Sequence, residues 1–372
     1  MEKSKYIWLD GELVDWDSAN VSVMTHTLHY GTGVFEGMRA RQTENGSGVF
    51  RLEDHVERLF RSAEAYNLDI PFDKKIISDA ILEIVKVNNL NSAYIRPLVF
   101  LGDGEMGLLP GNVPVRVAIA AWEWGAYLGD EAGREGVKVC ISDWQRISPK
   151  SFQPFAKGVG GYMNSTLAKI DAVKKGFDDA IMLSDTGSIA EGSGQNIFAF
   201  KDNILHTPPI ETGALGGITR KTVIEIANLF DIEFVEKDIN VEDLMSSDEI
   251  FFTGTATEVI GIVSIDGADI GNGLVGDLTT KIRNKYLEIV NGKDDNFKDY
   301  IKRLTEIIAS ATEYKGSILW DKTKPDGHPR KQVDITQITK LGWKPNIELS
   351  EGIKSTVEYF KESIENNSFL RL

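Results

Sequence analysis

The segment Gly125-Ala-Tyr-Leu-Gly-Asp-Glu-Ala-Gly-Arg-Glu-Gly136 divides this 372-residue chain, because it is rich in glycine and charge and has no apolar period. Before it, residues 93–101 and 115–122 are apolar runs of strand length. After it, residues 137–142 begin a series of short apolar runs separated by helical patterns. Strands and helices mixed on both sides of a linker predict an α/β (α+β mixed) protein of two subdomains.

The part before the linker, residues 1–124, is predicted to be a small α/β domain. Its first segment, residues 6–14, alternates apolar and polar side chains around the turn pair Asp10-Gly11, which predicts a β-hairpin. A second turn pair, Asn45-Gly46, joins the run 34–42 to the next strand and predicts another hairpin.

Two helices are expected to follow these hairpins. The first begins near Asp54, and a second is expected over residues 74–86. The apolar residues of the first stand at i, i+3, i+4 and i+7, which is the period of one helix face: they are Val56, Leu59, Phe60 and Ala63.

The part after the linker (125–136) is predicted to be a larger domain, residues 137–303, followed by a helical appendage, residues 304–372. A helix is expected from Thr219, with apolar residues on one face. Strands are expected at residues 137–142, 180–184, 197–200, 250–253 and 259–265.

The amino-acid composition limits the classes of function that this chain can have. Lys and Arg number 41 against 56 Asp and Glu, a net charge of −15 that disfavours nucleic acid as a partner. The single cysteine, Cys140, excludes an intramolecular disulfide and a thiolate metal cluster and is typical of a reducing compartment, so no metal is expected. No apolar run approaches membrane-spanning length and the N-terminus has no secretory pattern, so a cytoplasmic enzyme is expected.

Two segments carry reactive side chains. Lys157 lies in Phe155-Ala-Lys-Gly-Val-Gly-Gly-Tyr162, where small residues let a flat ligand approach the amine. Glu191 lies in Ser188-Ile-Ala-Glu-Gly-Ser-Gly-Gln-Asn-Ile-Phe198, just before an apolar strand. Taken singly, the first segment fits a solvated lysine in a loop better, and the second fits an ordinary loop.

Two further segments are suited to bind an anion. Leu215-Gly-Gly-Ile-Thr-Arg220 opens a helix with free backbone N–H groups, although simple capping by Thr219 explains it as well. Phe252-Thr-Gly-Thr-Ala-Thr-Glu258 offers hydroxyls and amides at a strand-to-turn junction. Together the four segments supply an amine, a carboxylate and two anion sites. A pyridoxal-phosphate enzyme needs that set, for covalent attachment, for the pyridinium nitrogen and for the phosphate.

Further motifs, taken in their order along the chain, indicate which family this chain resembles. The chain resembles the fold-type IV (class IV) aminotransferases, and among them the branched-chain amino acid aminotransferases, from about residue 5 to about residue 300. The motifs that carry this resemblance are His29-Tyr-Gly-Thr-Gly-Val-Phe-Glu-Gly-Met-Arg39, Asp54-His-Val-Glu-Arg-Leu59, Ala93-Tyr-Ile-Arg-Pro97 and Trp124-Gly-Ala-Tyr127.

The resemblance implies a role for each matching residue. Lys157 would bind pyridoxal 5′-phosphate covalently and act as the catalytic base, Tyr162 would bind the phenolic oxygen, and Glu191 would pair with the ring nitrogen. The residues expected to bind the phosphate are Arg58, Ile218, Thr219 and Thr255. The residues expected to bind the substrate are Tyr30, Phe35, Gly37, Tyr94, Arg96, Trp124, Tyr127, Thr255 and Ala256.

Two positions depart from the family pattern. The family often has Asn where this chain has Gly161, and Glu where it has Gln195. Neither change removes a reacting group, so the departures concern only the fine tuning of the cofactor.

The implied reaction is reversible transamination of leucine, isoleucine or valine with 2-oxoglutarate, giving branched-chain 2-oxo acids and L-glutamate. The resemblance also implies a homodimer or higher oligomer, with residues near Tyr30 and the linker crossing between subunits. Two other activities of the same fold type stay open, D-amino acid aminotransferase and aminodeoxychorismate lyase. From another class, the chain is also compatible with an inactive scaffold or nucleotide-sugar-binding protein.

Residues 304–372 resemble a different family, the C-terminal end of GDP-fucose synthase-like nucleotide-sugar epimerases and reductases. No dinucleotide-binding glycine motif follows a first strand, so the redox half of such an enzyme is not expected. A fusion remnant, a docking module and a partial nucleotide-sugar site around Arg330 and Lys331 stay open. The matching segments are Gly316-Ser-Ile-Leu-Trp-Asp321, Lys324-Pro-Asp-Gly-His-Pro-Arg-Lys331, Leu341-Gly-Trp-Lys-Pro345 and Leu349-Ser-Glu-Gly352.

Overall fold

A computed structural model describes residues 2–43, 46–125, 131–294, 307–316, 347 and 349–365. The chain forms two compact units, residues 1–291 and residues 292–372. In the second unit, helix α12 (Leu349–Glu365) agrees with the helical character predicted for the appendage. Most of the segments resembling an epimerase tail, with Arg330 and Lys331, lie outside the described residues, so the assignment of residues 304–372 stays a prediction.

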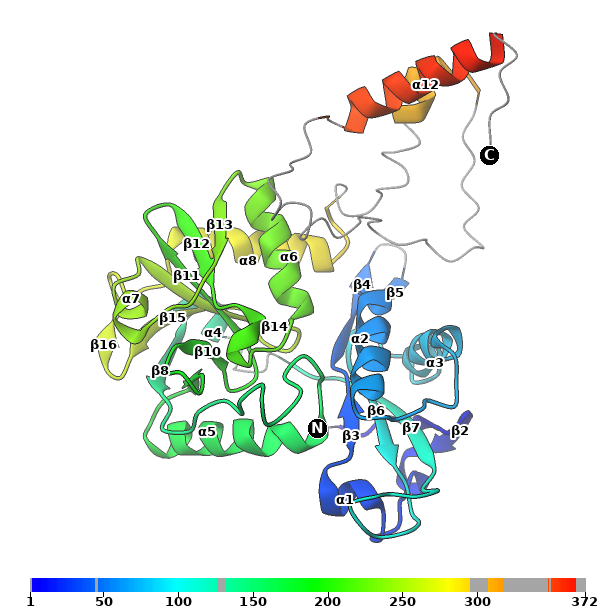
Figure 1. Ribbon diagram of the computed structural model, residues 1–372, viewed down its shortest axis with the longest axis vertical. Helices are drawn as coiled ribbons and strands as arrows, with labels where there is room; N and C mark the ends of the chain where they lie inside the picture. The colour runs from blue at the N-terminus through cyan, green and yellow to red at the C-terminus, as the bar shows by residue number, and fades with distance from the viewer. Residues whose placement is uncertain are drawn as a thin grey trace. The chain divides into compact units, whose positions relative to one another are not determined.

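An antiparallel seven-stranded sheet forms the first part of unit 1 (Figure 1). Its strand order is β2-β1-β7-β6-β4-β5, and β3 pairs with β6. Helices α2 (Leu52–Ala65) and α3 (Lys74–Val87) pack against each other, and α3 contacts β1, β6 and β7. The strands are β1 (Tyr6–Leu9), β2 (Glu12–Asp15), β3 (Gly33–Phe35), β4 (Met38–Thr43), β5 (Gly46–Val49), β6 (Ala93–Leu101) and β7 (Val115–Trp122).

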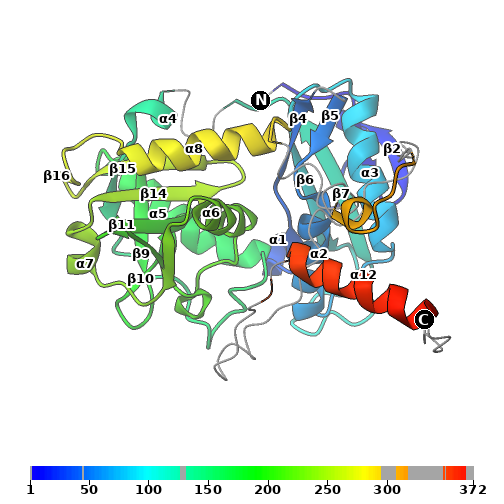
Figure 2. The same cartoon turned by 90° about the horizontal axis from the view of Figure 1, so that it is seen from above.

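A mixed nine-stranded sheet forms the second part of unit 1, in the order β10-β9-β8-β15-β14-β11-β12-β13, and β16 pairs with β15. Helix α5 (Tyr162–Lys174) packs on β9, α6 (Ile218–Leu229) on β13 and β14, and α8 (Asp277–Val290) on β14 and β15 (Figure 2). The strands are β8 (Val137–Ile141), β9 (Asp179–Leu183), β10 (Ile189–Gly192), β11 (Asn196–Lys201), β12 (Ile204–Thr207), β13 (Glu233–Glu236), β14 (Glu249–Gly254), β15 (Glu258–Ile265) and β16 (Ala268–Asp269).

The remaining elements are short. They are the helices α1 (His26–Tyr30), α4 (Ala132–Glu135) and α7 (Val241–Met245), and three 3₁₀ turns at Trp16–Ser18, Val159–Gly161 and Ile210–Thr212. Helix α4 falls inside the segment predicted as a linker. None of the helices in the described part of the chain combines the length and the apolar character needed to cross a bilayer.

The mixed α/β architecture predicted from the sequence is confirmed. Strands β6 and β7 have the predicted bounds, and the turn at Asp10 and Gly11 joins β1 to β2 with both residues at positive φ. The division of the chain into domains at residues 124, 136 and 303 stays a prediction.

The prediction of one continuous strand over residues 34–42 is wrong. The run is broken at Glu36 and Gly37 between β3 and β4. At this break the Glu36 N–H donates to the Pro97 carbonyl at 2.9 Å, and the Glu36 carboxylate turns into the protein interior to meet Arg58. At this point the chain leaves the regular strand conformation, and Glu36 forms its ion pair with Arg58.

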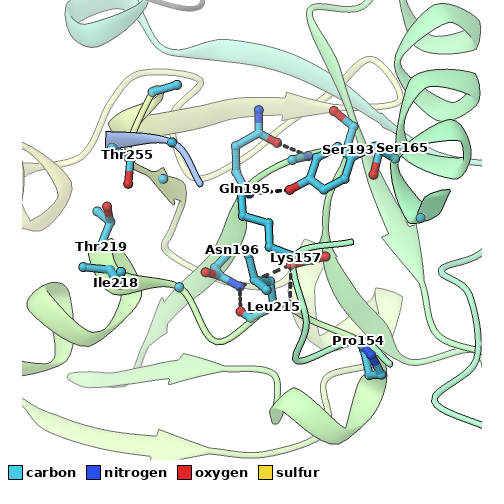
Figure 3. Close-up of a pocket in the computed structure, with 18 of the residues that line it drawn as sticks. Pro154, Lys157, Ser165, Ser193, Gln195, Asn196, Leu215, Ile218, Thr219 and Thr255 are labelled. Carbon is cyan, nitrogen blue, oxygen red and sulfur yellow. Dashed lines mark hydrogen bonds between the residues drawn. The ribbon is translucent and has the colours of Figure 1, made fainter. Parts of the chain in front are cut away.

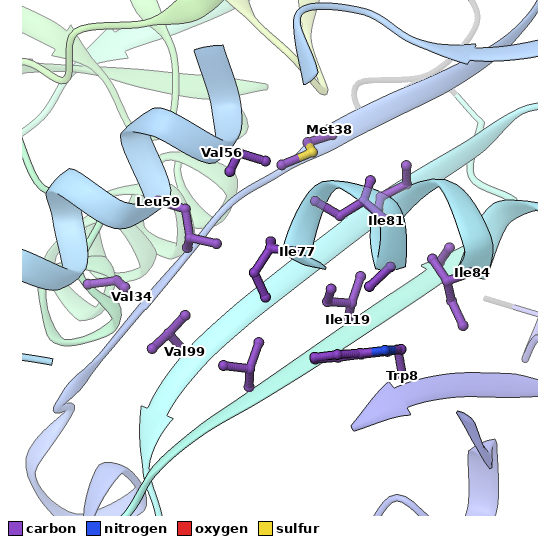
Figure 4. Close-up of a cluster of buried hydrophobic side chains, with 14 of the residues drawn as sticks. Trp8, Val34, Met38, Val56, Leu59, Ile77, Ile81, Ile84, Val99 and Ile119 are labelled. Atoms are coloured by element: carbon purple, nitrogen blue, oxygen red, sulfur yellow. The ribbon is translucent and has the colours of Figure 1, made fainter. Parts of the chain in front are cut away.

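The core of the first part lies between helices α2 and α3 and the sheet. Figure 4 shows Val56, Leu59 and Ile77 reaching from these helices toward strand residues such as Val99. Helix α3 is amphipathic, since Ile81 is fully buried while Leu82, the next residue, is 45% exposed. The buried face of α3 follows the helical period, because the interior of the protein lies on one side of the helix only.

This difference between neighbours in α3 gives a test of the core. Ile81→Ala is expected to lower the free energy of unfolding by about 2–5 kcal/mol, because it leaves a cavity. Leu82→Ala, in the same helix, is expected to change it by less than about 0.5 kcal/mol. Urea unfolding of both variants measures the difference, and equal losses would contradict the packing described here.

Candidate active site

A pocket in unit 1 collects residues from both sheets. Figure 3 shows Thr255, Thr219 and Ile218 on one side of it, with Lys157, Asn196 and Leu215 beside them. The residues singled out from the sequence that line this pocket are Gly37, Arg58, Tyr94, Lys157, Tyr162, Glu191, Ile218, Thr219, Thr255 and Ala256. Segments separated by up to about two hundred residues in the sequence therefore meet in one place.

Lys157 is fixed by its backbone and points its amine into the pocket. Its N–H donates to Ser62 Oγ at 3.1 Å, and its carbonyl accepts from the Phe35 N–H at 3.1 Å. Its Nζ lies 2.5 Å from Tyr162 Oη and 4.8 Å from the centre of the Phe35 ring. The two aromatic rings thus restrict the amine to one place.

Glu191 lies on strand β10, not in a loop, and is 4% exposed. Its Oε1 lies 2.9 Å from Arg146 Nη2. Its Oε2 accepts from Asn196 Nδ2 at 3.3 Å and from the Leu215 N–H at 3.0 Å. Three donors thus compensate the buried carboxylate, as its removal from water requires.

The N-terminus of α6 opens toward the same pocket. The helix starts at Ile218 with Gly217 at the N-cap, which makes no side-chain cap hydrogen bond. Thr219 lies inside the first turn, so the alternative of capping by its hydroxyl is wrong. The first amides of α6 are left to a ligand, and a helix N-terminus favours an anion.

Arg58, on α2, is buried next to this helix start. Its Nη1 donates to the Gly216 carbonyl at 3.0 Å. Its Nε and Nη2 donate to Glu36 at 2.6 Å and 2.9 Å, and His55 Nδ1 lies 2.7 Å from the same carboxylate. Burial would raise the pKa of Glu36, but Arg58 and His55 outweigh it and hold that pKa well below its usual range.

A cluster of aromatic and cationic side chains lies on the side of Tyr94. Arg96 Nη2 donates to Tyr94 Oη at 3.0 Å, and its guanidinium carbon lies 4.6 Å from the centre of the Phe35 ring. The rings of Tyr94 and Trp124 meet edge to face at 4.6 Å. At Gly37 a Cβ atom would overlap the Tyr94 hydroxyl, so only glycine fits beside this tyrosine.

Four of the residues expected at the site do not line the pocket directly. Phe35, Arg96 and Trp124 stand behind the lining residues and contact them. Tyr30, at the end of α1, is 42% exposed, and its ring packs against His26. A fifth, Tyr127, lies outside the described residues. The binding roles of all these residues stay predictions.

Arg146 is a site residue that the sequence does not indicate. Arg146 donates to Ser165 Oγ at 3.2 Å and to the Gly213 carbonyl at 3.3 Å, besides its ion pair with Glu191. No glycine turn or reactive neighbour marks this arginine in the sequence, because its charged partner lies in a distant segment of the chain.

Both departures from the family pattern have physical reasons. Gln195 Nε2 donates to the buried Asp179 at 2.9 Å, and a glutamate at position 195 would set a second carboxylate against it. A Cβ atom at Gly161 would lie 2.8 Å from the ring of Phe152, which lines the pocket. Glycine at position 161 therefore leaves room for the Phe152 ring.

Comparison with known proteins gives consistent matches. The family described as amino-transferase class IV matches residues 33–265. A branched-chain-amino-acid aminotransferase of Pseudomonas aeruginosa is 46% identical over 294 residues, which are 79% of this chain and 95% of that protein. About a fifth of this chain therefore lies outside that match.

Solved structures match in fold as well as in sequence. The branched-chain amino acid aminotransferase of Escherichia coli has a TM-score of 0.77 and 41% identity, covering 79% of this chain and 97% of that chain. A second branched-chain amino acid aminotransferase, from T.th., was solved as a complex with N-(5′-phosphopyridoxyl)-L-glutamate. It has a TM-score of 0.77 and 39% identity, covering 81% of this chain and 98% of that chain.

The Arg146–Glu191 ion pair gives a test of the site's architecture. Arg146→Met is expected to lower the free energy of unfolding by about 3 kcal/mol, because it leaves a buried carboxylate without its countercharge. Arg116→Met breaks the more exposed ion pair with Asp10 and is expected to cost less than about 1 kcal/mol. Urea unfolding checks both, and a smaller loss for Arg146→Met than for Arg116→Met would contradict the ion pair.

Proposed function

The chain belongs to the branched-chain-amino-acid aminotransferases of the class IV family, and we propose that it catalyses reversible transamination of leucine, isoleucine and valine with 2-oxoglutarate. The products are the branched-chain 2-oxo acids and L-glutamate. The observation that carries this proposal is one pocket that holds a restricted lysine amine, a paired buried carboxylate and an uncapped helix N-terminus.

The pocket residues fit pyridoxal 5′-phosphate as cofactor. The phosphate would be held by Arg58, by the amides of Ile218 and Thr219 at the start of α6, and by Thr255 in the β14–β15 turn. Tyr162 would bind the phenolic oxygen. Glu191 would face the ring nitrogen, where a carboxylate favours the protonated form. The bound cofactor supplies a conjugated ring that accepts the electron pair released when the substrate Cα–H bond breaks.

Lys157 is the residue proposed to move the proton. Its amine would take the proton from the substrate Cα and deliver it to the C4′ carbon of the cofactor, acting as base and then as acid. Tyr162 Oη, 2.5 Å from Nζ, holds the amine in position. The ion pair with Arg146 keeps Glu191 oriented. These contacts exist before any substrate binds, which lowers the cost of reaching the reactive geometry.

The substrate pocket must accept an aliphatic side chain and a carboxylate in turn. Phe35, Tyr94 and Trp124 offer aromatic walls that suit the aliphatic chain. Arg96, held by Tyr94, is the candidate for the carboxylate. The T.th. enzyme has been solved with a glutamate adduct and with 4-methylvaleric acid, which supports a pocket with these two uses.

A homodimer or higher oligomer is part of the proposal. Helix α1 and the loop at residues 103–111 are joined by a His26 Nε2–Gly107 carbonyl hydrogen bond of 2.8 Å. Around this contact Val23, Leu28 and Leu108 are more than half exposed. Such apolar exposure supports burial against a second copy of the chain. The cytoplasm is the proposed compartment, since Cys140 is a buried free thiol.

The first test of the function is a change of the catalytic lysine. Lys157→Ala is expected to lower turnover by at least about 1000-fold, because it removes the proton-moving amine. The phosphate contacts remain, so the variant is expected to bind the cofactor noncovalently. Lys150→Ala, at an exposed loop position, is the matched control and is expected to keep wild-type turnover. Turnover of Lys157→Ala near the wild-type rate would contradict the assignment.

A substrate panel tests the specificity. L-leucine is expected to be converted to its 2-oxo acid with 2-oxoglutarate as acceptor, while D-alanine and aminodeoxychorismate are expected to react at least about 100-fold more slowly. Product formation is followed by coupled detection of L-glutamate for L-leucine, and of pyruvate for D-alanine and aminodeoxychorismate. Preference for D-alanine or for aminodeoxychorismate would contradict the proposed specificity and indicate a D-amino acid aminotransferase or an aminodeoxychorismate lyase instead.

A further inference from the structure

The guanidinium group of Arg58 is held by three hydrogen bonds before any ligand enters the pocket. Nε and Nη2 bind the two oxygens of Glu36, at 2.6 Å and 2.9 Å, and Nη1 binds the Gly216 carbonyl at 3.0 Å. A guanidinium group has five N–H donors in one plane. One N–H of Nη1 and one N–H of Nη2 are therefore left for a ligand, and their direction is set by the partners of the other three.

Glu36 is the residue that defines this plane. Its side chain is completely buried, and both of its oxygens are used. The Gly37 N–H donates to its Oε2 at 3.2 Å, and His55 Nδ1 lies 2.7 Å from the same oxygen. An ionised carboxylate only accepts hydrogen bonds, so His55 donates from Nδ1 and holds Glu36 in addition to Arg58.

The place of Glu36 in the chain links the two ends of the pocket. The ring of Phe35, the preceding residue, lies 4.8 Å from the amine of Lys157, and the Phe35 N–H donates to the Lys157 carbonyl. Gly37, the following residue, lies so close to Tyr94 that a Cβ atom there would overlap the tyrosine hydroxyl. A three-residue segment thus touches the amine, the phosphate-side arginine and the substrate-side tyrosine.

From this geometry we propose that Glu36, supported by His55, is a positioning residue that orients Arg58 for the phosphate of the cofactor. The inference deepens the proposed function and rests on its cofactor site. Glu36 does not touch the cofactor itself. It acts by fixing the two remaining N–H groups of Arg58, so that the phosphate meets a preformed pair of donors.

Two rival roles for Glu36 predict different behaviour. If the carboxylate only stabilises the fold, its loss affects stability but not the contribution of the phosphate to binding. If it mainly neutralises Arg58, its loss frees a positive charge and strengthens phosphate binding. Only the positioning role predicts weaker phosphate binding together with unchanged binding of the ring.

The test compares two probes that differ only by the phosphate and cannot bond covalently to Lys157. Isothermal titration calorimetry of the full-length, cofactor-free protein gives the dissociation constants of pyridoxamine 5′-phosphate and of pyridoxamine. Glu36→Gln is expected to lower the ratio of the affinity for pyridoxamine 5′-phosphate to the affinity for pyridoxamine at least about tenfold. The reason is that the charge-assisted pair of hydrogen bonds between Glu36 and Arg58 is lost. The affinity for pyridoxamine is expected to stay within about twofold.

Glu225→Gln is the matched control. Glu225 forms a largely buried ion pair with Arg51, which joins the N-terminus of α2 to α6 outside the pocket. The Glu225→Gln variant is expected to keep the ratio of affinities within about twofold of the wild-type ratio, even if its stability falls. A drop of the ratio in Glu225→Gln as large as that in Glu36→Gln would overturn the proposal.

His55→Asn decides the question if Glu36→Gln does not fold. The asparagine side chain keeps an N–H donor near the position of His55 Nδ1 but holds the Glu36 carboxylate less firmly. The ratio of affinities is therefore expected to fall about threefold. An unchanged or higher ratio in the folded variants overturns the positioning role. If the wild-type protein itself binds both probes equally, the proposed phosphate site fails and this inference fails with it, whereas a wild-type preference for the phosphate with no effect of Glu36→Gln overturns the inference alone.

Discussion

The pocket depends on one constraint, that every charge taken out of water must be paired. Glu36 and Glu191 are both buried carboxylates, and each meets an arginine and further donors. A buried carboxylate without partners would take up a proton or destabilise the fold by several kcal/mol. Because these pairs join α2 to the β3–β4 junction, and β10 to the segment around Arg146, the same contacts that balance the charge also fix the geometry of the pocket.

The two sheets contribute different chemistry. The antiparallel sheet supplies the aromatic and cationic groups around Tyr94, which suit a substrate. The mixed sheet supplies Glu191 on a strand and the start of α6, which suit the cofactor. Lys157 lies in a segment tied to both, through Ser62 on α2 and through Tyr162 at the start of α5. An amine at this position is within reach of groups from either side, as proton transfer between substrate and cofactor requires.

The sequence predicts those elements whose signal is local. Strands β6 and β7 are mostly apolar runs, each with a single arginine, and the apolar stripes of α2 and α6 follow the helical period. Helix α5 carries no comparable stripe, since its buried residues are the small Ser165, Ala168 and Ala172. Motifs likewise indicate ten residues that line the pocket. Arg146 and the break at Glu36 escape prediction, because each is determined by a partner distant in the sequence.

The central claim is that the lysine, the buried carboxylate and the helix start work together on a cofactor that exchanges an amino group with a branched-chain amino acid. The most direct measurement is the absorbance spectrum of the purified protein before and after addition of L-leucine without a 2-oxo acid. We expect a band at the edge of the visible range that is replaced by one in the near ultraviolet, as the amino group is transferred. A protein that stays colourless after incubation with pyridoxal 5′-phosphate, or a yellow band that L-leucine leaves unchanged, would contradict the account.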